Sequence, residues 1–406
     1  MNMVIAALLA LLLAQQPDYS AQGVEALEKK EYAAAAAAFT KAIEADPNDY
    51  AAHFHLALAH SLLGDSARAI AGYERVLALK PGLYEAELNL GMLLLEQKQP
   101  EPAAARLRAA VEKKPKEFRP VFYLAEALLA GGQPAQAEPH YRTALDLDAK
   151  SAAAEHGLAR ALALQKRLDD AAPHIRKAAE LDTAYRDTLL ELASMYEADK
   201  RPAEAIPLYE QFPENAAARE RLGELLIEAG RAADAVPHLE AAVAASPTPA
   251  NRLALATAYL RSKQPDKAVP VIEQAIAAAP ENLDLRLFYG RVLRDQKNFR
   301  GAAQVFWQVA QKRPESREAW SELAAMLNAL ENFPQALAAL DKLEALGESG
   351  AAIHYLRAIM LDRLQQPAPA LASYEKFLGL SGGKHPDEEF KARQRARILK
   401  KELSKR

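Results

Sequence analysis

The sequence predicts an all-α protein, a solenoid of about eleven stacked helix-turn-helix repeats. Three observations predict this fold class. Similar residues return about every 34 positions through most of the 406 residues. Each repeat has two stretches with apolar residues at i, i+3 or i+4, and i+7, the spacing of an amphipathic helix. Small residues also recur at two fixed positions, which allows the two helix backbones of a repeat to approach closely.

The first element is an apolar segment at the N-terminus. Val4 to Ala14 is an unbroken run of eleven apolar residues, shorter than the roughly 20 that span a bilayer. It suits the apolar core of a bacterial-type secretory signal, with Ala14 as the last residue before cleavage. We therefore expect residues 1–15 to be a signal peptide and the protein to be exported to the periplasm or beyond, although no Lys or Arg precedes the run. The alternative is a buried or frayed helix start.

Eleven repeats follow over residues 16–382. They begin at residues 16, 50, 84, 118, 152, 186, 216, 249, 283, 317 and 351. Position 20 of every repeat is alanine, from Ala35 to Ala370, and position 8 is always glycine or alanine. Position 24 is always large and apolar, as in Phe39 and Tyr374. Because it lies on the same helix face as position 20, we expect it to fill the gap toward the next repeat.

Prolines mark two places in the second helix of the repeats. One set closes the helix, because proline cannot continue the hydrogen-bond ladder: Pro47, Pro81, Pro115, Pro247, Pro280 and Pro314. A second set stands at position 22, about one turn inside the helix: Pro139, Pro173, Pro207, Pro237 and Pro270. Each of these is expected to remove one backbone hydrogen bond and to bend the helix start.

Two repeats depart from the period. The sixth has 30 residues and the seventh has 33. We expect the second helix of the sixth repeat to stop about one turn early, near Pro213. The change is either a harmless deletion in an outer turn or a local change in superhelical pitch between repeats 1–6 and 7–11.

The C-terminal tail, residues 383–406, breaks the period. Pro386 and the three acids after it make a good helix start. A thin apolar stripe follows, made of Ala392, Ala396, Leu399 and Leu403. Residues 384–406 contain nine Lys or Arg and four Asp or Glu, which gives the tail a net charge of +5. We expect a basic capping helix that covers the apolar face of the last repeat; binding to an anionic surface is the alternative.

The repeat resembles the tetratricopeptide repeat. The family pattern of Leu-Gly, then Tyr, Ala, Phe, Ala and Pro is met in the third repeat by Leu90-Gly91, Leu94, Ala103, Leu107, Ala110 and Pro115. In the tenth repeat Trp320 takes the opening aromatic position of the pattern. The resemblance covers residues 16 to about 382. It implies a right-handed superhelix with a concave groove lined by the first helices, and a scaffold that binds peptides or proteins.

Composition and motifs exclude several classes of function. Lys plus Arg number 51 and Asp plus Glu 54, a net charge of −3, so no basic field favours nucleic acid. The absence of cysteine excludes disulfides, thiol catalysis and cysteine-ligated metals. No phosphate-binding loop, serine nucleophile elbow or H-E-x-x-H motif occurs. We therefore expect no enzyme activity, no cofactor and no metal; His53, His55 and His60 lack a four-residue spacing and are expected to pack or lie half exposed.

The concave groove is the expected binding site. The groove positions of the family map to eight residues of repeats 2–4: Phe54, Leu58, Leu88, Asn89, Met92, Phe122, Tyr123 and Glu126. This apolar wall suits an extended or helical partner segment, with the amide of Asn89 gripping a peptide backbone. The alternative is that these side chains bury against neighbouring first helices.

Two further features bear on the partner. In the ninth repeat Arg291, Arg294 and Asp295 offer either a general polar contact or a contact to an acidic motif of a partner. In this family, repeats that clamp the C-terminal carboxylate of chaperones have a lysine at position 5. No repeat of this sequence has lysine there, so we do not expect it to bind chaperone C-termini.

The leading hypothesis is a non-enzymatic, exported scaffold that binds a protein or peptide. The alternative is a membrane-associated assembly factor, held by the N-terminal segment and by the basic tail on anionic lipid; no motif specifies the partner or the oligomeric state.

Overall fold

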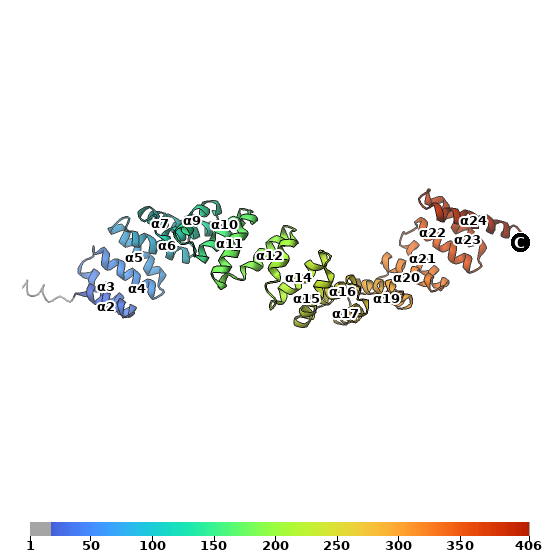
Figure 1. Cartoon of the computed structure of the whole chain (residues 1–406), viewed down its shortest axis with the longest axis horizontal. Coiled ribbons are helices and arrows are strands. Elements are labelled where there is room, and N and C mark those ends of the chain that lie inside the picture. The colour runs from blue at the N-terminus through green and yellow to red at the C-terminus, as the bar shows by residue number, and fades with distance from the viewer. Residues whose placement is uncertain (1–17, 406) are drawn as a thin grey trace, which may run out of the picture. The chain divides into compact units, whose positions relative to one another are not determined.

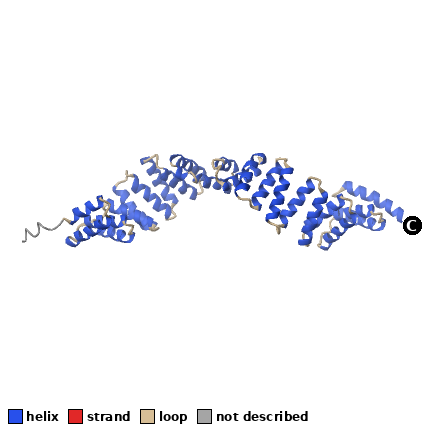
Figure 2. Cartoon of the chain, turned by 90° about the horizontal axis from the view of Figure 1, so that it is seen from below, coloured by secondary structure: helices blue, strands red, loops and turns tan. Residues whose placement is uncertain are grey.

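The computed structural model describes residues 18–405, and every regular element in that range is a helix (Figures 1 and 2). The predicted all-α solenoid is confirmed for this range. The expected signal peptide, residues 1–15, lies outside the described residues.

Each predicted repeat contains two successive helices, and these two pack on each other in repeats 1–5 and 7–11. The first helices of the eleven pairs are α2 (Tyr19–Glu28), α4 (Tyr50–Leu62), α6 (Tyr84–Glu96), α8 (Phe118–Ala130), α10 (Ala152–Leu164), α12 (Thr188–Ala198), α14 (Ala216–Glu228), α16 (Pro249–Arg261), α18 (Leu283–Asp295), α20 (Arg317–Ala329) and α22 (Ala351–Arg363). The second helices are α3 (Tyr32–Ala45), α5 (Ser66–Leu79), α7 (Pro100–Lys113), α9 (Pro134–Leu147), α11 (Leu168–Leu181), α13 (Pro202–Tyr209), α15 (Ala232–Ala245), α17 (Pro265–Ala278), α19 (Phe299–Lys312), α21 (Phe333–Ala345) and α23 (Pro367–Ser381).

The described residues divide into two compact units, and the division lies between Leu208 and Tyr209. Inside each unit a helix packs on its neighbours along the chain, as α6 does on α5 and α7, and α20 on α19 and α21. The core is therefore a row of neighbour-to-neighbour contacts, as expected when stacked repeats bury one another's apolar faces.

The sixth repeat has the short second helix that its sequence predicts. Helix α13 has 8 residues, whereas α11 and α15 on either side have 14 each. It ends at Tyr209, four residues before Pro213. A 3₁₀ turn at Thr183–Tyr185 also precedes α12. The boundary between the two compact units falls at the end of α13; an effect on superhelical pitch stays a prediction.

The fixed small and large positions form the core. All eleven alanines at position 20, from Ala35 to Ala370, have 0% of their surface exposed, and every large residue at position 24 is buried. The position-24 side chain packs on position 8 of its own repeat. A Cβ added to Gly91, for instance, would lie 2.6 Å from Cγ of Leu107. This intra-repeat contact adds to the expected contact with the next repeat.

The prolines at the helix ends behave as predicted. Helices α3, α5, α7, α15, α17 and α19 each end two residues before a proline. The five prolines at position 22 lie inside α9, α11, α13, α15 and α17. These helices continue through them, because a proline in the first turns forfeits only one ladder bond.

The turn between the two helices of each repeat contains a left-handed residue at position 15. In repeats 2, 4 and 7 this residue is Gly64, Gly132 or Gly230. In the other eight it is not glycine: Lys30, Lys98, Lys166, Lys200, Lys263, Lys297, Glu331 and Gln365, with φ between 57° and 61°. The same backbone turn is thus used in every repeat.

The tail forms α24 (Pro386–Leu403), which packs on α23. Ala392, Ala396 and Leu399 of the predicted stripe are buried against Tyr374 and Phe377. Among residues 18–405 no helix combines the length and apolar character that crossing a bilayer requires.

Candidate protein-interaction surfaces

The eight predicted groove residues of repeats 2–4 lie on three consecutive first helices of the first compact unit. They come from α4, α6 and α8. We call the surface formed by Phe54, Leu58, Asn89, Met92, Phe122, Tyr123 and Glu126 the first-helix face. Its members are all partly exposed. Leu88, the remaining prediction, is 6% exposed and belongs to the core cluster, so it packs against neighbours rather than facing a partner.

The aromatic side chains of this face rest on the core beneath them. Phe54, Met92, Phe122 and Tyr123 are partly buried and pack against the buried cluster of repeats 2–5. The ring of Phe54 lies edge-on to Tyr73 at 5.4 Å between centroids. These contacts hold each ring on one side and leave the other side for solvent or a ligand.

Phe122 is held in the same way. It stacks on Phe118 at 5.3 Å and meets Tyr141 edge-on at 6.2 Å. Both arrangements are the favourable geometries for aromatic pairs. The face therefore presents fixed rings rather than mobile ones.

Two polar groups on the face are partly engaged by buried tyrosines. Asn89 donates from Nδ2 to the hydroxyl of Tyr73 at 3.2 Å, and burial raises the pKa of Tyr73 to about 12. The carboxylate of Glu126 accepts a short hydrogen bond from the hydroxyl of Tyr141. Burial, and next the charge of Glu126, raise the pKa of Tyr141. In the described part of the chain no hydrogen bond uses Oδ1 of Asn89, which leaves a carbonyl acceptor for a peptide N–H.

The predicted arginines of the ninth repeat are already ion-paired. Both lie on α18 in the second compact unit, and both face acids of α20. Arg291 lies 3.1 Å from Glu318, and Arg294 contacts Glu322 as well as Asp295. An acidic partner would have to exchange with these pairs, so the site stays a prediction.

The histidine cluster makes packing and backbone contacts. His53 lies 3.0 Å from the carbonyl of Pro47 through Nε2, and His55 stacks on Phe39 at 5.2 Å. Over residues 18–405 no three His, Cys, Asp or Glu side chains are grouped so that they could hold a metal ion.

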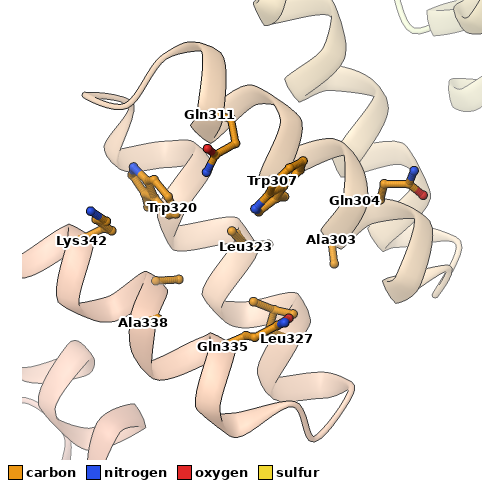
Figure 3. A pocket seen from close by; sticks show the side chains of 11 residues that line it. Ala303, Gln304, Trp307, Gln311, Trp320, Leu323, Leu327, Gln335, Ala338 and Lys342 are labelled. Carbon is orange, nitrogen blue, oxygen red and sulfur yellow. The ribbon is translucent and has the colours of Figure 1, made fainter.

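A pocket that the sequence did not predict lies in the second compact unit. It has a volume of about 560 Å³ and is bounded by α19, α20 and α21 (Figure 3). Trp307 stands at its edge with 53% of its surface exposed. The sequence contained one sign of this pocket: Trp307 occupies a repeat position at which all other repeats have a polar residue.

Comparison with known proteins agrees with the repeat. Profiles of the tetratricopeptide repeat match residues 20–84, 88–152, 124–186, 253–317, 290–351 and 327–385, and a second such profile matches residues 196–259. The chain belongs to the tetratricopeptide-repeat family. Membership of this family supports a protein-interaction scaffold. No curated protein matches this tetratricopeptide-repeat chain.

Among solved structures, this tetratricopeptide-repeat chain is similar to MamA proteins. A MamA RS-1 double mutant is 24% identical over 41% of this chain and 93% of its own, with a TM-score of 0.39. A crystal structure of MamA protein is 20% identical over 40% of this chain and 89% of its own, with the same TM-score of 0.39. MamA 41-end from Desulfovibrio magneticus RS-1 is 25% identical over 41% of this chain and 94% of its own, and its TM-score is also 0.39.

Proposed function

We propose that this tetratricopeptide-repeat protein is a non-enzymatic scaffold that binds a segment of a protein partner along the first-helix face of repeats 2–4. The observation that carries the proposal is the row of half-buried apolar side chains on α4, α6 and α8. Each loses its remaining water contact when a partner covers it, which is favourable in proportion to the apolar area buried.

The arrangement favours a peptide segment over a small molecule. The apolar side chains are spread over three helices, as a groove for a chain needs, and Asn89 adds a carbonyl acceptor. Rings already held by Tyr73 and Tyr141 lose little freedom on binding, which reduces the entropic cost of association.

The test is affinity capture with wild type and with the double variant Phe54→Glu/Phe122→Glu. The matched control is Thr40→Glu/Gln136→Glu, which adds the same two negative charges on the exposed faces of α3 and α9 in the same compact unit. We expect wild type and control to retain the same partners and the double variant to lose them, with melting temperatures that differ little. If the double variant retains the same partners, this site is wrong; a collapse of its melting temperature would show that the two rings serve packing.

A membrane-associated role is the second candidate, and the exposed side of α24 favours it. Phe390 and Ile398 are 62% and 48% exposed. Lys391, Arg397 and Lys401 fall on the same side of the helix by its 3.6-residue period. Apolar and basic side chains in this combination suit the surface of an anionic bilayer.

This second candidate is tested by sedimentation with vesicles of phosphatidylcholine, with and without phosphatidylserine. We expect binding only to the anionic vesicles, weaker in high salt, and lost in Phe390→Ser/Ile398→Ser. Wild type that stays in the supernatant with both vesicle types would refute it.

Export stays part of the proposal. It is tested by sequencing the N-terminus of the mature protein from cells. A start near Gln15 or Gln16 supports cleavage after Ala14, whereas a start at Met1 contradicts it.

A further inference from the structure

The pocket between α19 and α21 lies on the face formed by second helices, with α20 as its floor. Figure 3 shows Trp307 on α19 at one side and Ala338 and Lys342 on α21 at the other. The first-helix face of repeats 2–4 belongs to the other compact unit. The pocket is therefore a separate surface.

Trp307 is out of pattern for its position in the repeat. It stands at position 25, where the first repeat has Thr40 and the other nine have Glu, Asp or Arg, as in the flanking Glu273 and Asp341. The core residue of this turn is its neighbour Phe306, which has 0% of its surface exposed. The indole is thus not needed to hold α19 in place, and it exposes a large apolar surface where every other repeat is polar.

The floor of the pocket is fixed. Trp320 is 8% exposed and donates from Nε1 to the carbonyl of Pro314 at 2.8 Å. Leu323 and Leu327 are buried members of the same core cluster. A ligand therefore meets a preformed apolar surface and loses little free energy to reorganisation.

The polar lining indicates the chemistry of the ligand. Lys342 is the one charged residue that lines the pocket. In the described part of the chain no ion pair engages it, whereas the nearby acids Asp341 and Glu344 both pair with Arg357. The remaining polar lining consists of Gln304, Gln311 and Gln335. A carboxylate complements the lysine, and primary amides pair with backbone N–H and C=O groups.

We propose that this pocket binds an extended segment of a protein partner. A bulky apolar side chain of the segment inserts against Trp307, and an acidic side chain close to it pairs with Lys342. An extended segment is favoured over a helix because its backbone groups are free to bond the glutamine amides, whereas those of a helix are used internally. The proposal rests on the scaffold function but not on the first-helix face.

The two tryptophans of the chain make the test specific. Both line this pocket, so intrinsic tryptophan emission reports on it alone. Peptides are selected from a random displayed library on the full-length protein, synthesised, and titrated while emission is recorded. We expect enriched peptides that join a large apolar residue to an acid, and a blue shift of the emission as Trp307 is covered.

Variants then locate the binding. We expect Trp307→Glu to weaken the selected peptides at least tenfold, and Ala338→Arg, which fills the pocket from the opposite wall, to do the same. Both replace exposed residues, so circular dichroism should be unchanged. Lys342→Gln should weaken the acidic peptides several-fold and their amide analogues not at all. Phe54→Glu/Phe122→Glu should leave binding intact, which separates this pocket from the first-helix face.

Several outcomes would overturn the proposal. These are a library that yields no enriched peptide, enriched peptides that bind Trp307→Glu as tightly as wild type, and titrations without a change in emission. A blue shift that grows with protein concentration in the absence of peptide would also overturn it, because a second copy of the chain would then be the occupant.

Discussion

Gly290 and Phe306, at positions 8 and 24 of the ninth repeat, lie in direct contact. A Cβ placed on Gly290 would be 2.5 Å from Cε1 of the Phe306 ring, and this ring is fully buried. In the seventh repeat, a Cβ placed on Gly223 would overlap the side chain of Leu239 in the same way. These repeats join their two helices by seating a large side chain on a glycine, which lets the backbones approach closely.

This contact predicts that Gly290→Val destabilises the protein. The added side chain overlaps a ring that has no room to move, and overpacking of this kind costs about 1–3 kcal/mol. Urea unfolding of the intact chain should shift to lower concentration, and amide exchange should speed up first in α18 and α19. An unchanged midpoint would show that the helices can separate at little cost.

A substitution of Gly379 on α23 is expected to stabilise the protein, in contrast to Gly290→Val. This glycine is exposed, and a Cβ added to it would meet nothing within 4 Å. Gly379→Ala should stabilise the protein by about 0.5–1 kcal/mol, because alanine is the better helix former. The same unfolding measurement checks it, and a destabilised variant would mean that the position has a contact partner.

The third prediction concerns the left-handed residue of the turn between the two helices of a repeat. Lys98 has φ of 57°, and Gly132 has φ of 71° at the same position of the next repeat. Lys98→Gly should raise the midpoint of thermal unfolding, whereas Gly132→Val should lower stability by about 1–2 kcal/mol, since a residue with a Cβ is strained there. Equal effects of the two changes would contradict the assignment of strain to this turn.

The fourth prediction concerns pH. His55 is half-buried against Phe39, and burial lowers its pKa below the ordinary value, although Asp49 opposes the shift. Between the lowered pKa and the ordinary value near 6.5, the unfolded chain takes up a proton that the folded chain does not. Stability is therefore present above pH 6.5 and falls as the pH falls toward 5. His55→Phe should lose less stability than wild type between pH 7.5 and pH 5, by urea unfolding; equal losses would exclude His55 as a contributor.

Much of the fold was predictable from the sequence because the repeat fixes it. Ala35 and its equivalents recur only where helices touch, so their period gives the helix pairs and the core. The left-handed turns were not predictable at Lys98 or Lys297, because lysine has no preference for that conformation and the geometry of the chain reversal imposes it. The one sign of this conformation in the sequence was the glycine that three repeats have at the same position: Gly64, Gly132 and Gly230.

The candidate sites were predictable only in part. Phe54 and Leu88 occupy equivalent positions of neighbouring repeats, yet Phe54 is partly exposed and Leu88 is buried. Their burial depends on the side chains of adjacent helices, which a repeat pattern does not describe. The pocket at Trp307 was not predictable from the groove positions, because those lie on first helices, whereas Trp307 lies on the second helix α19 and the pocket is lined by three helices.

The most direct measurement of the central claim uses a photoreactive benzoylphenylalanine in living cells. It is placed in one strain at Met92, on the first-helix face, and in another at the exposed Arg108 of α7. We predict discrete protein adducts after illumination from Met92 and none from Arg108. No adduct at Met92, or the same adducts at both positions, would contradict a partner bound along the first-helix face.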